Sequence, residues 1–121
     1  MLTTFDGCQV VRWCGAELRF ARRHGWTGRV FSGQRSRARQ LAAAIGYAAR
    51  HGLTLRQAYP SGVYASNHVG TSWPKGAVDV TDPEGLARAL RVAHSRPRGR
   101  RLRWALDAGL DDPPHFSASG R

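Results

Sequence analysis

Residues 76–84, GAVDVTDPE, join a short apolar segment to the start of a helix and set the pattern for the chain around them. Residues 77–80 are apolar except for Asp79, which predicts a brief strand carrying one acidic side chain. The TDPE segment supplies a helix N-cap followed by proline at the first helical position, so a helix is expected over residues 83–94. A strand leading directly into a helix indicates a mixed architecture.

Two further helices are expected on the N-terminal side of this stretch. The first covers residues 10–24 and is capped by Gly25, and its apolar positions recur at helical spacing. These positions are Val11, Cys14, Leu18 and Ala21. Ser36 can cap the second helix, which runs through an alanine-rich stretch to about Arg50 and stops at Gly52.

The remaining segments predict short strands and loops. Residues 28–32 are expected to form a strand, and residues 53–76 are mostly loop with room for one short strand or helical turn. Residues 102–110 fit either a strand or a short helix, and a proline-stiffened turn at 111–114 leads into a final strand from His115. Because these elements cannot form a regular series of parallel crossovers, the expected fold class is α+β.

Length and composition predict one globular domain. The chain has 121 residues, 41% of them apolar and spread through periodic segments, so residues 1–121 are expected to form a single domain and to act as a monomer. No apolar run reaches the roughly 18 to 20 residues of a membrane span. Residues 1–6 lack the pattern of a secretory signal, which leaves the localisation open between release by lysis, carriage on a phage particle and excision from a longer exported protein.

The formal charge of +11 arises from 19 basic and 8 acidic residues, and every basic residue except Lys75 is an arginine. Such an excess favours an anionic partner, and charge alone does not separate nucleic acid from an anionic cell wall. The densest basic stretch, residues 96–103, is expected to be an exposed loop or the approach to a strand, with a simple solvated face as the alternative.

The two cysteines, Cys8 and Cys14, are too few for a disulfide framework and lack the spacing of a redox or zinc-ribbon motif. Cys14 is expected on the apolar face of the first helix beside Leu18, and Cys8 in a loop before that helix. A disulfide between them is not implied, and no functional role is assigned to either.

Three residues carry side chains of the kinds that form catalytic metal sites. Catalytic zinc characteristically takes three nitrogen or oxygen ligands from the protein and keeps a fourth position for water. His68 lies in a predicted loop, Asp79 interrupts the predicted strand, and His115 begins the last strand. A carboxylate on a buried strand needs a cation or hydrogen bonds to offset its desolvation, although strand alternation could instead turn Asp79 to solvent.

Three segments carry a resemblance to a known family. Residues 32–36, SGQRS, are followed by Gln40; residues 66–68, SNH, are followed by GAVDV at 76–80; and DPPHF occurs at 112–116. Together they resemble the signatures of the zinc D-alanyl-D-alanine carboxypeptidase and L-alanyl-D-glutamate endopeptidase family. The resemblance covers most of the chain and implies the hedgehog/DD-peptidase fold, a small antiparallel sheet with flanking helices.

The sequence departs from the family pattern at two places. Gln34 stands where the family has an aromatic residue, and His68 and Asp79 are eleven positions apart, a longer interval than is usual in the family. Residues 70–75 are therefore interpreted as an insertion that reshapes the cleft. This insertion bears on substrate choice more than on metal binding.

The resemblance implies a metal ion and a catalytic base. His68, Asp79 and His115 match the family's ligands of Zn²⁺. Asp112 matches its catalytic base, which agrees with the chemistry expected of a carboxylate held by two prolines shortly before a metal ligand. Asp111 is the nearest rival for that role.

The resemblance also implies residues that bind the substrate. Arg35 is expected to polarise the scissile carbonyl or to pair with a substrate carboxylate, and pairing with a nearby acid is the alternative. Gln40 and Ser66 are expected on the substrate-binding side, and Ser66 is expected to hold a hydrogen bond close to the ligand His68.

The implied activity is zinc-dependent hydrolysis of an amide bond in peptidoglycan stem peptides. Removal of a terminal D-alanine and cleavage of an internal bond both remain open. One alternative is a basic module that binds the wall or nucleic acid without cutting, although the chain lacks a recognisable nucleic-acid motif. Another is a metallohydrolase with the same site and a different substrate.

Overall fold

The computed structural model describes residues 1–93 and 100–121. Within these residues it has four α-helices and two small antiparallel sheets, which confirms a mixed architecture of helices and antiparallel strands. The helices are α1 (Arg12–Arg23), α2 (Arg37–His51), α3 (Leu55–Ala58) and α4 (Pro83–Ala93), with two short 3-10 helices, η1 (Val63–Ala65) and η2 (Leu106–Ala108).

The smaller sheet is a two-stranded hairpin, and the larger sheet has four strands and lies between the helices. The hairpin pairs β1 (Leu2–Phe5) with β2 (Cys8–Val11). The larger sheet has the strand order β3-β4-β6-β5, and all its neighbours are antiparallel. Its strands are β3 (Val30–Ser32), β4 (Ala77–Val80), β5 (Arg103–Trp104) and β6 (His115–Ser117).

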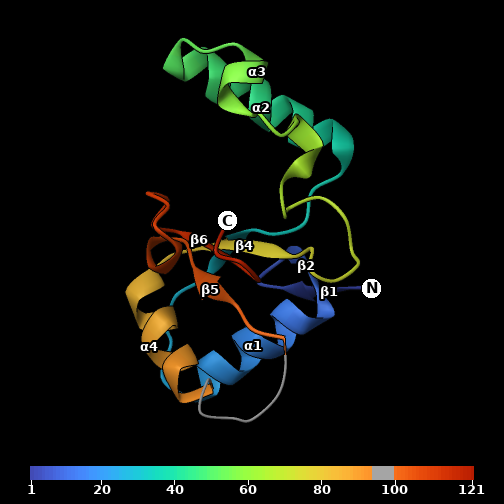
Figure 1. Cartoon of the computed structure of the whole chain (residues 1–121). Coiled ribbons are helices and arrows are strands. Elements are labelled where there is room, and N and C mark those ends of the chain that lie inside the picture. Colours follow the sequence, from blue (N-terminus) through green and yellow to red (C-terminus); the bar gives the residue numbers. More distant parts are fainter. Residues whose placement is uncertain (94–99) are drawn as a thin grey trace.

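The helices lie on both sides of the larger sheet. Figure 1 shows α1 and α4 below it, and α2 and α3 standing away from it on the opposite side. We call residues 36–65, which contain α2, α3 and η1, the arm, and the rest of the described chain the body. Within the described residues, no helix is long and apolar enough to cross a membrane.

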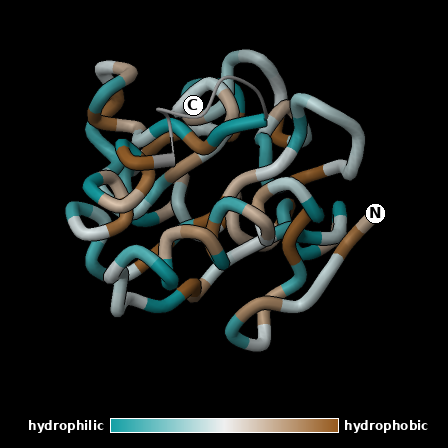
Figure 2. The backbone as a smooth tube through the Cα atoms, turned by 90° about the horizontal axis from the view of Figure 1, so that it is seen from below, coloured by the Kyte–Doolittle hydropathy of each residue, from teal (hydrophilic) through white to brown (hydrophobic). Residues whose placement is uncertain are grey.

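The core lies between the larger sheet and the helices α1 and α4. Val78 and Phe116 are paired across β4 and β6, and both are buried in one apolar cluster with Leu18 of α1 and Leu86 of α4. Figure 2 shows that hydrophobic segments alternate with hydrophilic ones along the described parts of the chain. Because neighbouring residues of a strand point to opposite faces, Asp79 and His115 face away from this core.

The expected boundaries of α2 and the expected start of α4 are confirmed. Ser36 Oγ accepts a hydrogen bond of 3.1 Å from the backbone N–H of Arg39, and α2 ends at Gly52 in the left-handed conformation, φ 64°. Helix α4 begins at Pro83 as predicted. The predicted end of that helix at residue 94, and the first half of the basic stretch at 96–103, lie outside the described residues.

The predicted start of the first helix is wrong. Val10 and Val11 belong to strand β2, and α1 begins at Arg12. Cys8 also lies in β2 and not in a loop, whereas Cys14 is buried on α1 as predicted. Both cysteines are free, and burial raises the pKa of the Cys14 thiol.

The hairpin explains this difference. Asp6 and Gly7 both have positive φ, 52° and 79°, which is the backbone of a two-residue turn that matches the twist of paired strands. The turn brings Phe5 opposite Cys8 and continues the ladder to Leu2 opposite Val11. Val10 and Val11, which were expected in the helix, are therefore strand residues that precede it.

The short elements are found close to the expected places. The predicted strand at 28–32 is the three-residue β3, and the predicted loop at 53–76 contains α3 and η1. The segment at 102–110, for which a strand and a helix were equally good interpretations, contains both β5 and η2. The final strand starts at His115 as predicted.

Candidate metal centre

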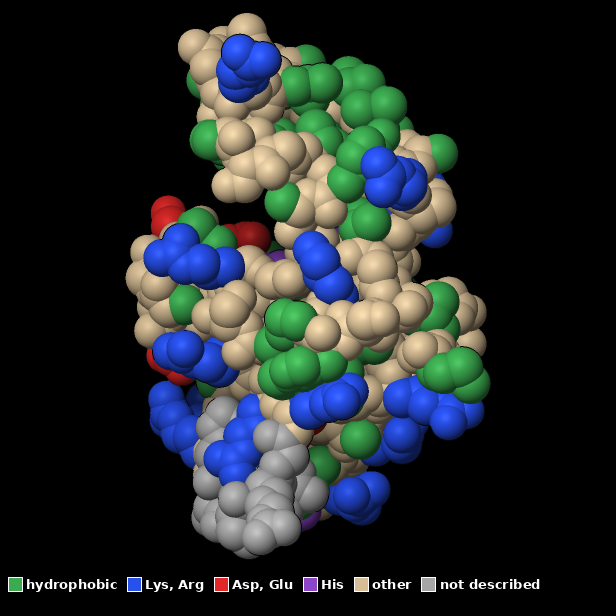
Figure 3. Space-filling model, turned by 45° about the vertical axis from the view of Figure 1, so that its right-hand side comes forward, with side chains coloured by type: hydrophobic (Ala, Val, Ile, Leu, Met, Phe, Trp, Pro, Cys, Tyr) green, Lys and Arg blue, Asp and Glu red, His purple; other side chains and the backbone are tan. Residues whose placement is uncertain are grey.

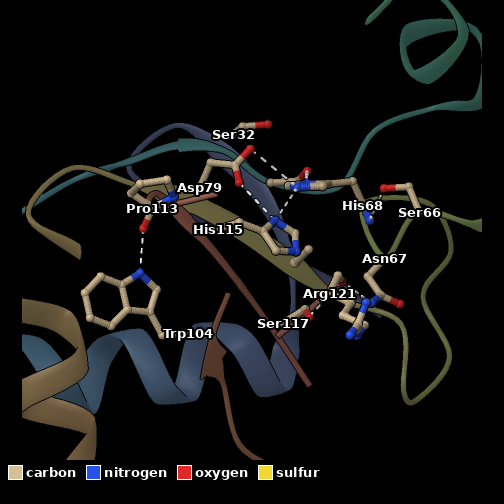
Figure 4. Close-up of polar contacts among 12 residues, drawn as sticks. Ser32, Ser66, Asn67, His68, Asp79, Trp104, Pro113, His115, Ser117 and Arg121 are labelled. Carbon is tan, nitrogen blue, oxygen red and sulfur yellow. Dashed lines mark hydrogen bonds and ion pairs between the residues drawn. The ribbon is translucent and has the colours of Figure 1, made fainter. Parts of the chain in front are cut away.

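The three predicted metal ligands come together although they are far apart in the sequence. Asp79 in β4 and His115 in β6 are direct cross-strand partners. His68 approaches from the loop that follows the arm, and one ligand atom from each residue lies within 4.8 Å of the others. Figure 4 shows the two imidazole rings and the carboxylate pointing toward one another.

The distances define a compact cluster. His115 Nδ1 lies 3.1 Å from Asp79 Oδ1, and His68 Nε2 lies 3.4 Å from Asp79 Oδ2. The two histidine nitrogens are 3.3 Å apart. His68 and His115 are buried, with 4% and 6% of their surface exposed, so the cluster faces little solvent. Two imidazole nitrogens and one carboxylate could hold a metal ion, and this is a donor set used by catalytic zinc.

A backbone carbonyl orients the ring of His68. Its Nδ1 lies 2.7 Å from the carbonyl oxygen of Gly33, which can only accept, so Nδ1 carries the proton. Nε2 of the neutral ring is then left with its lone pair toward Asp79 and His115. The backbone N–H of His68 donates to Ser66 Oγ at 3.2 Å, so Ser66 bonds the backbone of His68, while the hydrogen bond of the ring is made with the carbonyl of Gly33.

Charge and burial act against each other in this cluster. Burial raises the pKa of Asp79, but the hydrogen bonds and charges of His115 and His68 lower it more, so the pKa of Asp79 lies well below its usual value. Burial lowers the pKa of His115, but the hydrogen bond and charge of Asp79 outweigh it, so the pKa of His115 lies above its usual value. A proton on His115 would therefore compete with a metal ion for the Asp79 side of the ring.

Arg35 lies at the edge of the cluster. Its Nη2 is 3.6 Å from Asp79 Oδ2 and donates to Ser32 Oγ at 2.9 Å. Its Nη1 donates to Gln40 Oε1 at 3.0 Å. A quarter of the Arg35 side chain is exposed, so the guanidinium is both held in place and accessible.

Gln40 lies beneath Arg35, where it positions the guanidinium. It is only 2% exposed, and its Nε2 donates to the backbone carbonyl of Val63 at 3.1 Å. A side chain so covered could affect a bound molecule only through Arg35.

Asp112 lies in the turn that precedes β6. Its backbone carbonyl accepts a hydrogen bond from the N–H of His115 at 3.1 Å, and Trp104 Nε1 donates to the carbonyl of Pro113 at 2.6 Å, which fixes the turn. Burial raises the pKa of the half-buried Asp112; His115 partly opposes this increase and the negative charge of Asp79 adds to it. Asp111, the rival for its role, is exposed.

One residue that fixes the centre was not singled out as functional from the sequence. Gln34 departs from the signature that the surrounding residues resemble, and its Nε2 donates to the carbonyls of Asn67 and Gly70 at 3.1 and 2.6 Å. Its Oε1 accepts from the N–H of Ala77 at 3.0 Å, so one amide ties the loop of His68 to the strand of Asp79. The departure at position 34 was the available signal.

The segment interpreted as an insertion is also tied to this loop. Lys75 Nζ donates to the carbonyls of Ala65 and Ser66 at 2.8 and 3.2 Å. Trp13 Nε1 donates to the carbonyl of Lys75 at 3.1 Å. Residues 70–75 therefore pack as part of the rim beside His68.

Searches with this chain find no match among protein-family models, curated proteins or solved structures. The centre is therefore interpreted from its own geometry.

Proposed function

We propose that this chain is a zinc-dependent peptidase that hydrolyses an amide bond in peptidoglycan stem peptides, with a hedgehog/DD-peptidase type of fold. The observation that carries the proposal is the convergence of His68, Asp79 and His115 from three separate segments. His68 and Asp79 belong to one sequence signature and His115 to another. If these signatures did not serve a common site, there would be no reason for their side chains to come together in the fold.

The donor set fits zinc. Two nitrogens and one carboxylate oxygen are ligands of a kind that catalytic zinc uses, and the carbonyl of Gly33 supplies the outer hydrogen bond that metal-bound histidines usually need. Nδ1 of His115 lies 3.1 Å from Asp79 Oδ1 and 3.3 Å from His68 Nε2, so Nδ1 is the ring atom directed to the other two ligands. When bound, zinc polarises a carbonyl and acidifies a water molecule.

The residues around the ligands can supply the remaining chemistry. Asp112 accepts the proton of the attacking water and passes it to the departing amine, a role that its raised pKa favours because a base is most effective when its pKa approaches the working pH. Arg35 binds the oxygen on which negative charge develops, or a carboxylate of the substrate. Gln40 and Ser32 hold that guanidinium in place.

The choice of substrate rests on the family resemblance and on charge. A chain with a net charge of +11 is concentrated in an anionic cell wall by electrostatic attraction, which places the enzyme among its substrates. The loop at 70–75 departs from the family pattern, so an experiment has to identify which bond is cut.

The first experiment identifies products. Purified peptidoglycan fragments are incubated with zinc-loaded protein, with and without a chelator, and are analysed by mass spectrometry. Asp112→Asn should retain one zinc per chain and lose turnover by about a hundredfold or more, whereas the exposed neighbour in Asp111→Asn should retain both. Fragments that stay unchanged by a fully zinc-loaded protein would overturn the peptidoglycan assignment.

The second experiment tests the ligands. His68→Ala, Asp79→Ala and His115→Ala should each lose zinc measured by plasma mass spectrometry, together with activity. His51→Ala, on the exposed surface of α2, is the matched control and should bind zinc as the parent does. Stoichiometric zinc in the three ligand variants would show that the ion binds elsewhere.

The excess of basic residues favours one second candidate, a binding module without catalysis. Between residues 18 and 78 the chain contains no acidic residue. Zinc-independent binding to DNA that weakens steeply with salt would support this candidate, because neutralised phosphates release counterions.

A further inference from the structure

The arm combines positive charge with an open surface. Residues 36–65 contain four arginines and no aspartate or glutamate. Figure 1 shows the arm standing clear of the body, and Figure 3 shows hydrophobic and basic side chains on it with no acidic ones. Its arginines are Arg37, Arg39, Arg50 and Arg56.

Helix α2 has one covered face. Gln40, Ala44 and Ala48 are its buried residues, and they lie on the side that packs against α3 and η1. The covered face therefore consists of two alanines and one glutamine. The larger aliphatic side chains of α2, Leu41 and Ile45, lie on other faces of the helix.

The opposite face of α2 is apolar and uncovered. Ala38, Ala42, Ile45 and Ala49 recur at helical spacing, and all four are exposed, Ile45 to 52%. Half-buried Leu41 lies at one edge of this face, one turn before Ile45. An exposed isoleucine in the middle of a helix face has no packing role in the body.

Arginines flank this apolar face. At 100° per residue, Arg39 and Arg50 project to one side of the line through Ala42 and Ile45, and Arg37 projects to the other. Arg39 and Arg50 are exposed, and the guanidinium of Arg37 lies 4.0 Å from the ring centre of Tyr64. Apolar side chains between flanking arginines form the pattern of a helix that lies in a lipid interface, with the charged groups at headgroup level.

We propose that the open face of α2, centred on Ile45 and flanked by Arg39 and Arg50, docks the protein on the surface of an anionic phospholipid bilayer. A soluble polyanion would bind the arginines and would give the exposed aliphatic side chains no role. A second copy of the chain would bring like-charged arms together, which opposes pairing. The proposal concerns the arm alone and does not depend on the metal centre.

Vesicle flotation tests the proposal with full-length protein. Vesicles of phosphatidylglycerol mixed with phosphatidylcholine should carry the protein at low ionic strength, and vesicles of phosphatidylcholine alone should not. Ile45→Gln should weaken binding about tenfold by removing the inserted side chain. Phe31→Gln removes an exposed hydrophobic side chain from β3 in the body and should bind as the parent does.

A matched pair of double variants separates the arm from net charge. Arg39→Gln with Arg50→Gln should weaken binding about thirtyfold, since each basic residue near an anionic surface contributes about a further factor of five. Arg88→Gln with Arg91→Gln removes the same charge from exposed positions of α4 and should have much less effect.

Two outcomes would overturn the proposal. If both double variants lost vesicle binding equally and Ile45→Gln had no effect, the protein would be attracted to the vesicles by its net charge alone. Binding to a soluble polyanion such as heparin but not to anionic vesicles would show that the arm binds an anionic polymer and not a bilayer. Circular dichroism and zinc content of each variant distinguish these results from unfolding or from failure of the metal centre.

Discussion

At the scale of single residues, Asp79 determines what the centre can bind. Its two carboxylate oxygens lie 3.1 to 3.6 Å from nitrogens of His115, His68 and Arg35. Because His115 and His68 keep its pKa low, Asp79 is ionised throughout the neutral range and remains available as a ligand. The histidines, by contrast, must be deprotonated at the atoms that bind a metal.

The pair of His115 and Asp79 predicts a pH dependence of stability in metal-free protein. Folding raises the pKa of His115 above 6.5, so the stabilisation by its protonated form is fully present below about pH 6.5 and is lost as the pH rises through the folded pKa. Urea unfolding of chelated protein should therefore show decreasing stability across this window. His115→Gln should remove the decrease, and His51→Gln should keep it.

Zinc affinity should change in the opposite direction over the same window. It should rise with pH as His115 loses its proton, because the proton and the metal compete for the ring. Competition titrations with a chromogenic chelator measure this directly. An affinity independent of pH between about pH 6 and pH 8 would contradict the assignment of His115 as a ligand.

At the scale of elements, the turn between β3 and α2 sets the position of His68. Gly33 in this turn is buried, and its carbonyl fixes the imidazole of His68. A Cβ added at Gly33 would collide with the backbone carbonyl of Gln9, which already accepts from the N–H of Gln34 at 2.7 Å. The close approach of two backbones requires glycine there.

Gly33→Ala should therefore destabilise the protein by about 2 kcal/mol or more and weaken zinc binding about tenfold or more, because the carbonyl must move. Gly46→Ala is the control. A Cβ at Gly46, within α2, would meet only the flexible tip of Arg50 at 3.3 Å, and stability should rise by up to about 1 kcal/mol. Chemical unfolding and zinc titration of both variants test the two effects, and an unchanged Gly33→Ala protein would show that the turn can relax.

Elements with local signals could be predicted from the sequence. The caps at Ser36 and Gly52 and the proline at position 83 depend on neighbouring residues alone, so α2 and the start of α4 were found. The hairpin was missed although Asp6 and Gly7 are typical of its turn. The apolar period of α1 extends back into Val10 and Val11, and only pairing with β1 shows that these residues are a strand.

The candidate ligands could be chosen from the sequence, but their supports could not. His68, Asp79 and His115 carry recognisable side chains within short signatures. Gln34 bonds a backbone carbonyl, and the Gly33 carbonyl bonds the imidazole of His68, each more than 30 positions away in the chain, and no local pattern identifies such partners. Tertiary contacts therefore supply the part of the centre that orients its ligands.

At the scale of the whole molecule, the candidate metal centre joins three segments that all follow the arm in the sequence. Asp79 and His115 belong to the four-stranded sheet of the body, while His68 lies on the segment that returns from the arm. A bound ion would connect these parts and would be lost on unfolding. Its binding free energy is then added to the stability of the whole fold.

Zinc should raise the free energy of unfolding by about 2.7 kcal/mol when its free concentration is about a hundredfold above Kd. Scanning calorimetry should show a higher Tm with zinc and a return to the lower value with chelator. Asp79→Ala should remove the response, and Asp111→Ala should retain it. A zinc-dependent shift of the same size in Asp79→Ala would place the stabilising ion at another site.

The arm leaves and rejoins the body at one place. The N–H of Arg35, just before the arm, donates to the carbonyl of His68, just after it, at 2.6 Å. The arm is thus an excursion of the chain whose two ends are joined by this hydrogen bond, and β4 and β6 both lie outside it. In terms of chain topology, a change in the length of α2 or α3 would alter the reach of the arm, while Asp79 and His115 stay on the same two paired strands.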